Sequence, residues 1–197
     1  MPVITHVFPS FSERHPKFEK FGEISKESIA LFQEKAAPSL LADMLIEFWQ
    51  EYGEGRFSDG LLYVCDPIEK KSTLDFFFPG SDLYPIVISS FGDIFFTDFK
   101  QLYSLTPVYG WFTKKSPNFE LLFEISFWRE EFLNDVLNQT LHHKAIQNLG
   151  NLEPNEIFGF EPAIALGGSD DNIDFVKRFQ MDAHLAFLAQ LVELEER

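Results

Sequence analysis

The chain has 197 residues and a formal net charge of −15, because 31 Asp and Glu residues outnumber 16 Lys and Arg residues. This charge argues against unaided binding to nucleic acid or to an anionic membrane, since phosphate contacts require clustered basic side chains. A single cysteine excludes an internal disulfide framework and a cysteine-based zinc site. The length and a hydrophobic content of 45% fit one globular domain or two small, closely associated ones.

The first half of the chain is predicted to form helices followed by a meander of strands. After an irregular start, one helix is expected over residues 28–35 with Ser25 as its N-cap, interrupted at Pro38. A second helix is expected from Ser39, and Gly53 ends it. Short apolar runs then predict strands over residues 61–65, 85–88, 94–96, 101–105 and 108–113. A short helix is expected over residues 69–78, between the first two strands. This order predicts an α+β fold, an antiparallel sheet with helices packed on one side.

The second half begins at the predicted boundary Ser116–Pro117, which divides the chain into segments 1–115 and 116–197. The boundary is short, so we expect two closely associated subdomains. Beyond it the pattern predicts helices over 119–128 and 135–149, a stop at Gly150 and a strand over 157–160. A last helix is expected to start at Asn172 or Asp174 and to run to about Glu193. Core positions include several of the 24 phenylalanines, namely Phe32, Phe48, Phe95, Phe175 and Phe179.

Acidic residues exceed basic ones both before and after residue 105, so the acid is not a detachable tail. It serves either solubility alone or the attraction of a cationic protein, and the composition leaves both open. The first ten residues have no cationic region and no long apolar run, and no stretch approaches about 20 apolar residues. We therefore expect a cytoplasmic protein without a secretory signal or a membrane span.

The acidic run after the glycine pair Gly167-Gly168 invites a metal or phosphate interpretation. Asp170, Asp171, Asn172 and Asp174 lack the twelve-residue spacing of a calcium loop, and helix capping is the favoured explanation. Three neighbouring carboxylates would also repel a phosphate at the glycines, so a plain turn is favoured there. No metal and no cofactor is expected.

The histidines and the cysteine give no catalytic pattern. His142 and His143 are adjacent and cannot share one helix face, which makes them a poor chelating pair. His184 and Cys65 lie in apolar surroundings and are interpreted as a core histidine and an inert buried thiol. The nucleophile-elbow and zinc-protease motifs do not occur. Nothing in these patterns therefore argues for catalysis.

Residues 148–168 read NLGNLEPNEIFGFEPAIALGG and resemble the pattern LGxLxxxEhhGFxPAhALGG, where h is hydrophobic. His184-Leu185 and residues 188–191 resemble the closing helix of the same domain. This domain is the C-terminal part of the Tdi-type immunity proteins, which are partners of type VI secretion DNase effectors. Trp49, Tyr52-Gly53, Asp59-Gly60, Asp66-Pro67 and residues 90–95 resemble the GAD-like domain that precedes it. The pattern falls on Gly150, Leu152, Glu156, Gly159, Phe160, Pro162, Ala163, Leu166, Gly167, Gly168 and, further on, His184.

The resemblance implies a binding protein rather than an enzyme, an antitoxin that binds a cognate secreted toxin, a nuclease, and blocks its active or DNA-binding surface. A basic toxin would fit the acidic composition, with no direct binding to nucleic acid or membrane. Turn positions supply the candidate toxin contacts, which are Asp59, Asp66, Asp98, Asp170, Asp171 and Asp174. A regulatory adaptor with another basic partner, or an enzyme with an unrecognised site, are the alternatives, and the oligomeric state is left open.

Overall fold

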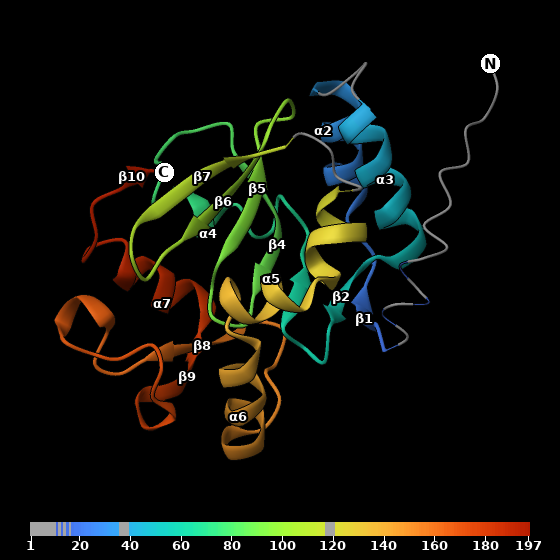
Figure 1. The fold of residues 1–197 in the computed structure, drawn as a ribbon. Helices are drawn as coiled ribbons and strands as arrows, with labels where there is room; N and C mark the ends of the chain where they lie inside the picture. Colours follow the sequence, from blue (N-terminus) through green and yellow to red (C-terminus); the bar gives the residue numbers. More distant parts are fainter. Residues whose placement is uncertain (1–10, 12, 14, 16, 36–39, 117–120) are drawn as a thin grey trace.

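The structure is a computed structural model that describes residues 11, 13, 15, 17–35, 40–116 and 121–197. Its central element is an eight-stranded sheet with the order β1-β2-β3-β4-β5-β6-β7-β10 (Figure 1). Strands β1 to β7 run antiparallel to their neighbours, and β10 adds in parallel to β7. The strand bounds are Glu19–Gly22 (β1), Glu54–Phe57 (β2), Leu62–Val64 (β3), Tyr84–Ser89 (β4), Ile94–Thr97 (β5), Leu102–Thr106 (β6), Trp111–Lys115 (β7) and Glu195–Glu196 (β10). The predicted meander and the α+β class are confirmed.

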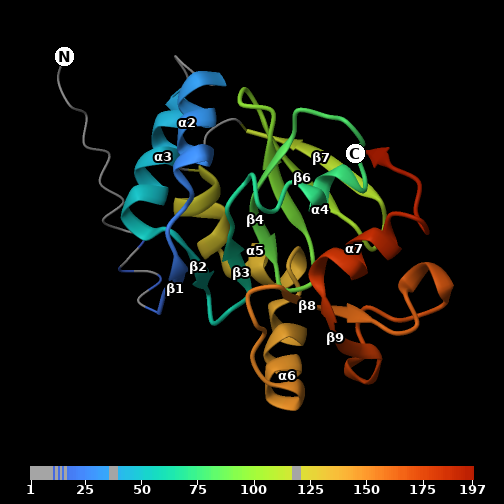
Figure 2. The same cartoon turned by 180° about the vertical axis from the view of Figure 1, so that it is seen from behind.

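Helices cover both faces of this sheet, so the expectation of helices on one side is wrong (Figures 1 and 2). The helices are α2 (Lys26–Lys35), α3 (Leu40–Tyr52), α4 (Ser72–Asp75), α5 (Glu130–Asp135), α6 (Gln139–Leu149) and α7 (Met181–Leu188). Helices α2, α3 and α5 pack with Leu62 and Val64 of β3, whereas α4 and α7 pack with Tyr63 and Cys65. A strand that is apolar at successive positions needs cover on both faces, which is the physical reason.

The larger core cluster joins the two halves of the chain through aromatic rings. Phe48 of α3 lies 4.7 Å from Phe123, measured between ring centroids, and Phe95 of β5 lies 4.9 Å from Phe127 at an interplanar angle of 85°. Phe123 and Phe127 belong to a π-helical turn (Leu121–Ile125) and a 3-10 turn (Ser126–Trp128), where one helix over 119–128 was expected. The predicted Phe32 is also fully buried. Segments before and after residue 116 therefore share one hydrophobic core.

Local signals placed several element ends correctly. Ser25 caps α2, because the Ser28 amide donates to its hydroxyl at 3.1 Å. Gly53 and Gly150 end α3 and α6 with positive φ angles of 74° and 83°. The expected helix over 69–78 contracts to α4 with turns on either side. Pro38, Ser39, Pro117 and Phe119, which the predictions also used, lie outside the described residues.

The helix expected from Asn172 to about Glu193 is wrong. Asn172 does cap, since its side chain accepts from the Asp174 amide at 3.0 Å, but it caps only a 3-10 turn over Ile173–Phe175. Residues Val176–Gln180 then form β9, which pairs antiparallel with β8 (Glu156–Phe160) as a two-stranded sheet. Helix α7 follows. Phe175 and Phe179, expected to be buried on that helix, are half-buried. Pairing with a distant strand outweighs the helical spacing here.

The helix expected over 135–149 starts later, as α6 at Gln139, and α5 precedes it where no helix was expected. Asn138 stands between them with a left-handed φ of 53°, a conformation that asparagine tolerates better than most residues. Its side-chain amide donates to the Asp170 carbonyl at 3.0 Å, which fixes the corner. Strands β1 and β10 were not expected at all. No helix among the described residues is long and apolar enough to cross a membrane.

Candidate functional site

Residues 148–168, called the family-like stretch below, are joined to one end of the large sheet by backbone and side-chain hydrogen bonds. The Phe158 amide of β8 donates to the Ser90 carbonyl at 2.7 Å, and the Ser90 amide donates to the Leu61 carbonyl at 2.7 Å. Buried Arg56 of β2 donates from Nη2 to the carbonyls of Glu153 and Glu156, at 3.2 and 3.0 Å. The two segments thus meet along one continuous seam.

Several residues of the family-like pattern have close packing or hydrogen-bond contacts. A Cβ built at Gly159 would lie 2.8 Å from two ring carbons of buried His184, and one at Gly168 would meet the Pro162 carbonyl group. Glu156 accepts from Arg178 and from the Glu153 amide, contacts that hold its pKa below the usual range. Leu152, Phe160 and Ala163 are buried, Gly167 has a φ of 93°, and Pro162 and Leu166 are exposed. We propose that the pattern is mainly a scaffold, as the sequence suggested.

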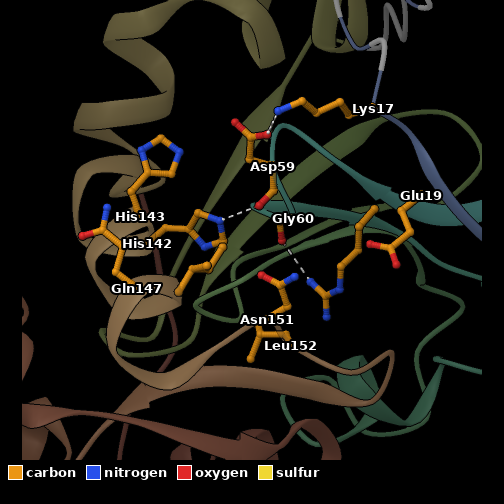
Figure 3. A pocket seen from close by; sticks show the side chains of 11 residues that line it. Lys17, Glu19, Asp59, Gly60, His142, His143, Gln147, Asn151 and Leu152 are labelled. Atoms are coloured by element: carbon orange, nitrogen blue, oxygen red, sulfur yellow. Dashed lines mark hydrogen bonds and ion pairs between the residues drawn. The ribbon is translucent and has the colours of Figure 1, made fainter.

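A first hollow of about 430 Å³ opens between the β2–β3 turn and α6 (Figure 3). His142, His143 and Gln147 of α6 line one side, and Lys17 and Glu19 line the other. The Lys17 ammonium pairs with the Asp59 carboxylate at 3.2 Å across the mouth.

Two buried nitrogen groups form the wall of this hollow. His142 Nε2 donates to the Asp59 carbonyl at 3.1 Å, and Arg56 Nη1 donates to the Gly60 carbonyl at 3.1 Å. Burial lowers the pKa of His142 to about 4 and that of Arg56 to about 10, so the imidazole is neutral and the guanidinium charged at pH 7. Two cations, Lys17 and Arg56, face two carboxylates, Glu19 and Asp59, so the hollow favours neither sign of charge.

A second hollow of about 350 Å³ opens on the other side of α6. Its charged lining is mostly acidic, because it contains one cation, Lys144, and four carboxylates, which are Asp93, Asp135, Asp170 and Asp171. The hollow is built from the β4–β5 turn, the β6–β7 turn, the corner between α5 and α6, and the loop before the 3-10 turn at Ile173–Phe175. Both segments of the chain therefore contribute to it.

Among the predicted toxin contacts, Asp66 is a correction. It was expected to be exposed, but it is only 1% exposed. Its carboxylate accepts from the Ser25 amide at 2.6 Å and from the Ser28 hydroxyl at 2.5 Å, so it anchors the start of α2. Burial opposes its charge, but these hydrogen bonds outweigh burial and lower its pKa. A side chain engaged in this way is not available to a partner.

The other predicted acids lie at the surface but do not form one cluster. Asp59 is at the mouth of the first hollow, and Asp170 and Asp171 line the second. Asp170 also accepts from the Tyr109 hydroxyl. Asp98 accepts from the amides of Lys100 and Gln101 at 3.0 and 2.8 Å, as a turn residue does. Asp174 is exposed in its 3-10 turn.

The remaining candidates from the sequence take structural positions. His184 is buried and stacks on Phe179 with ring centroids 4.2 Å apart, and His142 is buried while His143 is exposed. Cys65 is fully buried, and burial raises the pKa of its thiol well above the usual value. Within the described residues no group of three or more histidine, cysteine or acidic side chains could hold a metal ion.

Two family models match the chain in succession. The model of the GAD-like domain matches residues 6–110, more than half of the chain, and the model "T6SS immunity protein Tdi1, C-terminal" matches residues 118–192. The chain is a type VI secretion immunity protein with a GAD-like domain. Membership of this family implies a cognate toxin as the binding partner of the immunity protein.

The fold of the immunity protein is shared with a solved protein. The structure entitled "Crystal structure of Atu4351 from Agrobacterium tumefaciens" superimposes with a TM-score of 0.74 at 15% sequence identity, over 96% of this chain and 91% of that one. At this identity the similarity concerns the fold. Comparison with curated proteins gave no match.

Sequence reasoning missed Arg56 and Asp93, the two charged side chains buried at the hollows. Arg56 is 3% exposed and Asp93 9% exposed. Asp93 directly precedes the apolar strand β5, which was the available signal, whereas β2 reads Glu-Gly-Arg-Phe and offers no apolar pattern around Arg56. Arg56 bonds to the carbonyls of Glu153 and Glu156, about 100 residues away along the chain, and Asp93 accepts from nearby Ser89. The distant partners of Arg56 cannot be inferred from its own segment.

Proposed function

We propose that this immunity protein neutralises a secreted nuclease by covering the basic surface with which the toxin holds DNA. The family match carries the immunity role, and the charge of −15 supports a basic target. Nuclease surfaces that bind DNA present clustered Lys and Arg, which an acidic protein can occupy in place of the phosphates. The segments 1–115 and 116–197 act together, since both contribute to the core and to the second hollow.

The acidic turn residues are the proposed contacts. Asp59, Asp98, Asp170, Asp171 and Asp174 stay in this set, whereas buried Asp66 leaves it. The carboxylates of Asp98 and Asp170 are held by hydrogen bonds, so little side-chain entropy is lost when they bind. Such preorganised negative charge speeds encounter with a cationic partner and orients it.

Co-expression with a toxin gene beside the gene for this chain tests the immunity role. The toxin alone should kill the host cell, and the immunity protein should restore growth. Failure to restore growth, with both proteins present in soluble form, would overturn the role for that toxin.

The association rate of the two purified proteins tests the electrostatic part of the proposal. Between about 0.05 and 0.5 M salt the rate should fall by roughly tenfold or more, because screening shortens the reach of the charges. An association rate that does not change with salt would remove the DNA-mimic version and leave the immunity role standing.

A further inference from the structure

The second hollow combines an apolar floor with an acidic rim. The rings of Phe91 and Phe160 stack at a centroid distance of 5.5 Å and an interplanar angle of 8°, and Leu141 packs with them in the same buried cluster. Half-buried Val108 extends this surface. The floor thus offers contact area to an aliphatic chain.

The carboxylates around this floor form no ion pair within the described part of the chain. Asp135, Asp170 and Asp171 make no ion pair with any residue that the structure describes, and neither does Lys144. Elsewhere on the described surface acids do pair with bases, as Asp59 does with Lys17 and Asp82 with Lys35. The rim therefore carries uncompensated negative charge.

Asp93 places a further carboxyl group in the wall of the same hollow. It is 9% exposed and accepts hydrogen bonds from the Ser89 hydroxyl at 2.7 Å and from the Thr106 side chain, and it forms no ion pair with any described residue, Lys144 included. Burying a carboxylate without a counter-charge is costly, and its pKa rises to about 6 through desolvation. A cation entering the hollow would remove this cost, so Asp93 is an observation independent of the rim that points to a positively charged occupant.

We propose that this hollow receives one lysine or arginine side chain of the cognate toxin, an inference that rests on the proposed function. The aliphatic stem would lie on the floor at Phe91, Leu141 and Phe160, and the cationic tip would reach the rim carboxylates. The volume of about 350 Å³ accommodates one long side chain rather than a helix or strand. The occupant follows from charge complementarity, because the lining carries four carboxylates and one ammonium.

A small-molecule titration tests the hollow without the toxin. Agmatine, a guanidinium group on a four-carbon chain, should shift the backbone amide signals of residues 91–93, 109–110 and 170–171 in an NMR titration at millimolar concentration. The double variant Asp135→Asn with Asp171→Asn should weaken this binding by about tenfold, since each neutralised rim charge contributes severalfold. Signals that shift elsewhere, or equal binding to the double variant, would overturn the inference.

A matched control separates the rim from the general acidity of the protein. Asp43 on α3 and Asp182 on α7 are exposed aspartates outside the lining of the hollow. The double variant Asp43→Asn with Asp182→Asn changes the net charge by the same amount and should leave agmatine binding unchanged. Thermal unfolding of both variants verifies that each is folded.

The toxin itself provides the second arm. The Asp135→Asn, Asp171→Asn variant should bind the toxin about tenfold more weakly than the control variant does. If the wild type restores growth and the two variants bind the toxin equally, the inference fails and the proposed function stands. If the wild type does not restore growth, the proposed function fails, and the agmatine titration still decides whether the hollow takes a guanidinium. Self-association that the rim variant abolishes would show a second copy as the occupant and overturn the inference.

Discussion

Replacement of Gly159 by alanine tests the packing at the centre of the family-like stretch. Gly159 lies in β8 with no room for a side chain, since a Cβ would stand 2.8 Å from Cδ2 and from Cε1 of His184. Relaxed carbon–carbon contacts are about 3.5 to 4.0 Å, so the imidazole must move by roughly 1 Å. His184 cannot do so freely, because it is 5% exposed and stacked on Phe179 at 4.2 Å. Overpacking of this kind lowers the free energy of unfolding by about 1–3 kcal/mol.

Urea unfolding measures the effect, and a second glycine provides the control. Gly159→Ala should lower the midpoint while the m-value stays constant. Gly22 of β1 is also a strand glycine, but a Cβ there would have only Glu54 Oε2 near it, at 3.9 Å. Gly22→Ala should therefore change the free energy of unfolding by less than about 0.5 kcal/mol.

A double-mutant cycle identifies the clash as the cause. His184→Ala alone should cost about 2 kcal/mol through lost burial and lost stacking on Phe179. Added to His184→Ala, Gly159→Ala should cost at least 1 kcal/mol less than it does in the wild type, because the ring it meets is gone. Additive effects within about 0.3 kcal/mol would refute the reasoning, even if both single variants were destabilised.

Three further predictions concern the buried charges. Arg56→Met should lower the free energy of unfolding by about 3 kcal/mol in urea, because it leaves three carbonyl groups without their donor. Asp66→Asn should cost about 2 kcal/mol, since an amide oxygen cannot replace a carboxylate that accepts four hydrogen bonds. Because the pKa of Asp66 is lowered in the folded chain, this loss should shrink as the pH falls below the usual range of an aspartate. The pKa values of His142 and His184 lie at about 4, below the usual 6.5, so the unfolded chain binds their protons first and stability falls on acidification between pH 6.5 and 4. Asp93, with its pKa raised to about 6, has the opposite effect: the folded chain binds this proton at a higher pH than the unfolded chain does, so acidification between pH 6 and 4 increases stability through this group. Two histidines against one aspartate predict a net loss of about 1 kcal/mol from pH 6 to pH 5, and a gain in urea midpoint over this interval would contradict the assignment.

Features that depend on neighbouring residues were predictable from the sequence. Ser25 caps α2 and Gly53 ends α3, because a cap depends on groups within four residues along the chain. The apolar runs at Tyr84–Ser89 and Ile94–Thr97 became the neighbouring antiparallel strands β4 and β5 for a similar reason, since short connections favour antiparallel neighbours.

Features that depend on distant partners were not predictable. Residues Val176–Gln180 form a strand because β8 is there to pair with them, and their helical spacing concealed this. Strand β10 forms on the exposed edge of β7, where the Glu195 amide donates to the Gly110 carbonyl at 2.9 Å. Neither pairing can be recognised from the residues of the strand itself.

The positions of the acidic side chains at the candidate site were likewise not predictable from the sequence. Asp66 and Asp170 both follow or precede turn residues and look alike in the sequence, yet the first is buried at the cap of α2 and the second lines a hollow. What distinguishes them is the chain segment that lies opposite. For Asp66 this segment is Ser25 to Ser28, 38 to 41 residues away, and for Asp170 it is Tyr109 and Asn138.

The two matched segments share one hydrophobic core, and this bears on the proposed mode of binding. Leu122, Phe123 and Phe127, which follow the predicted boundary, lie in the same core as α3 and β5, and Arg197 returns to donate to the Phe112 carbonyl at 2.9 Å. Separating the chain near residue 116 would expose this core on both pieces. The second hollow takes Asp93 from one segment and Asp170 from the other, so the shared core fixes the distance between its carboxyl groups. A binding site whose parts are held in this way loses little entropy when a partner enters, so in the proposed mode of binding both segments would contribute to one recognition event.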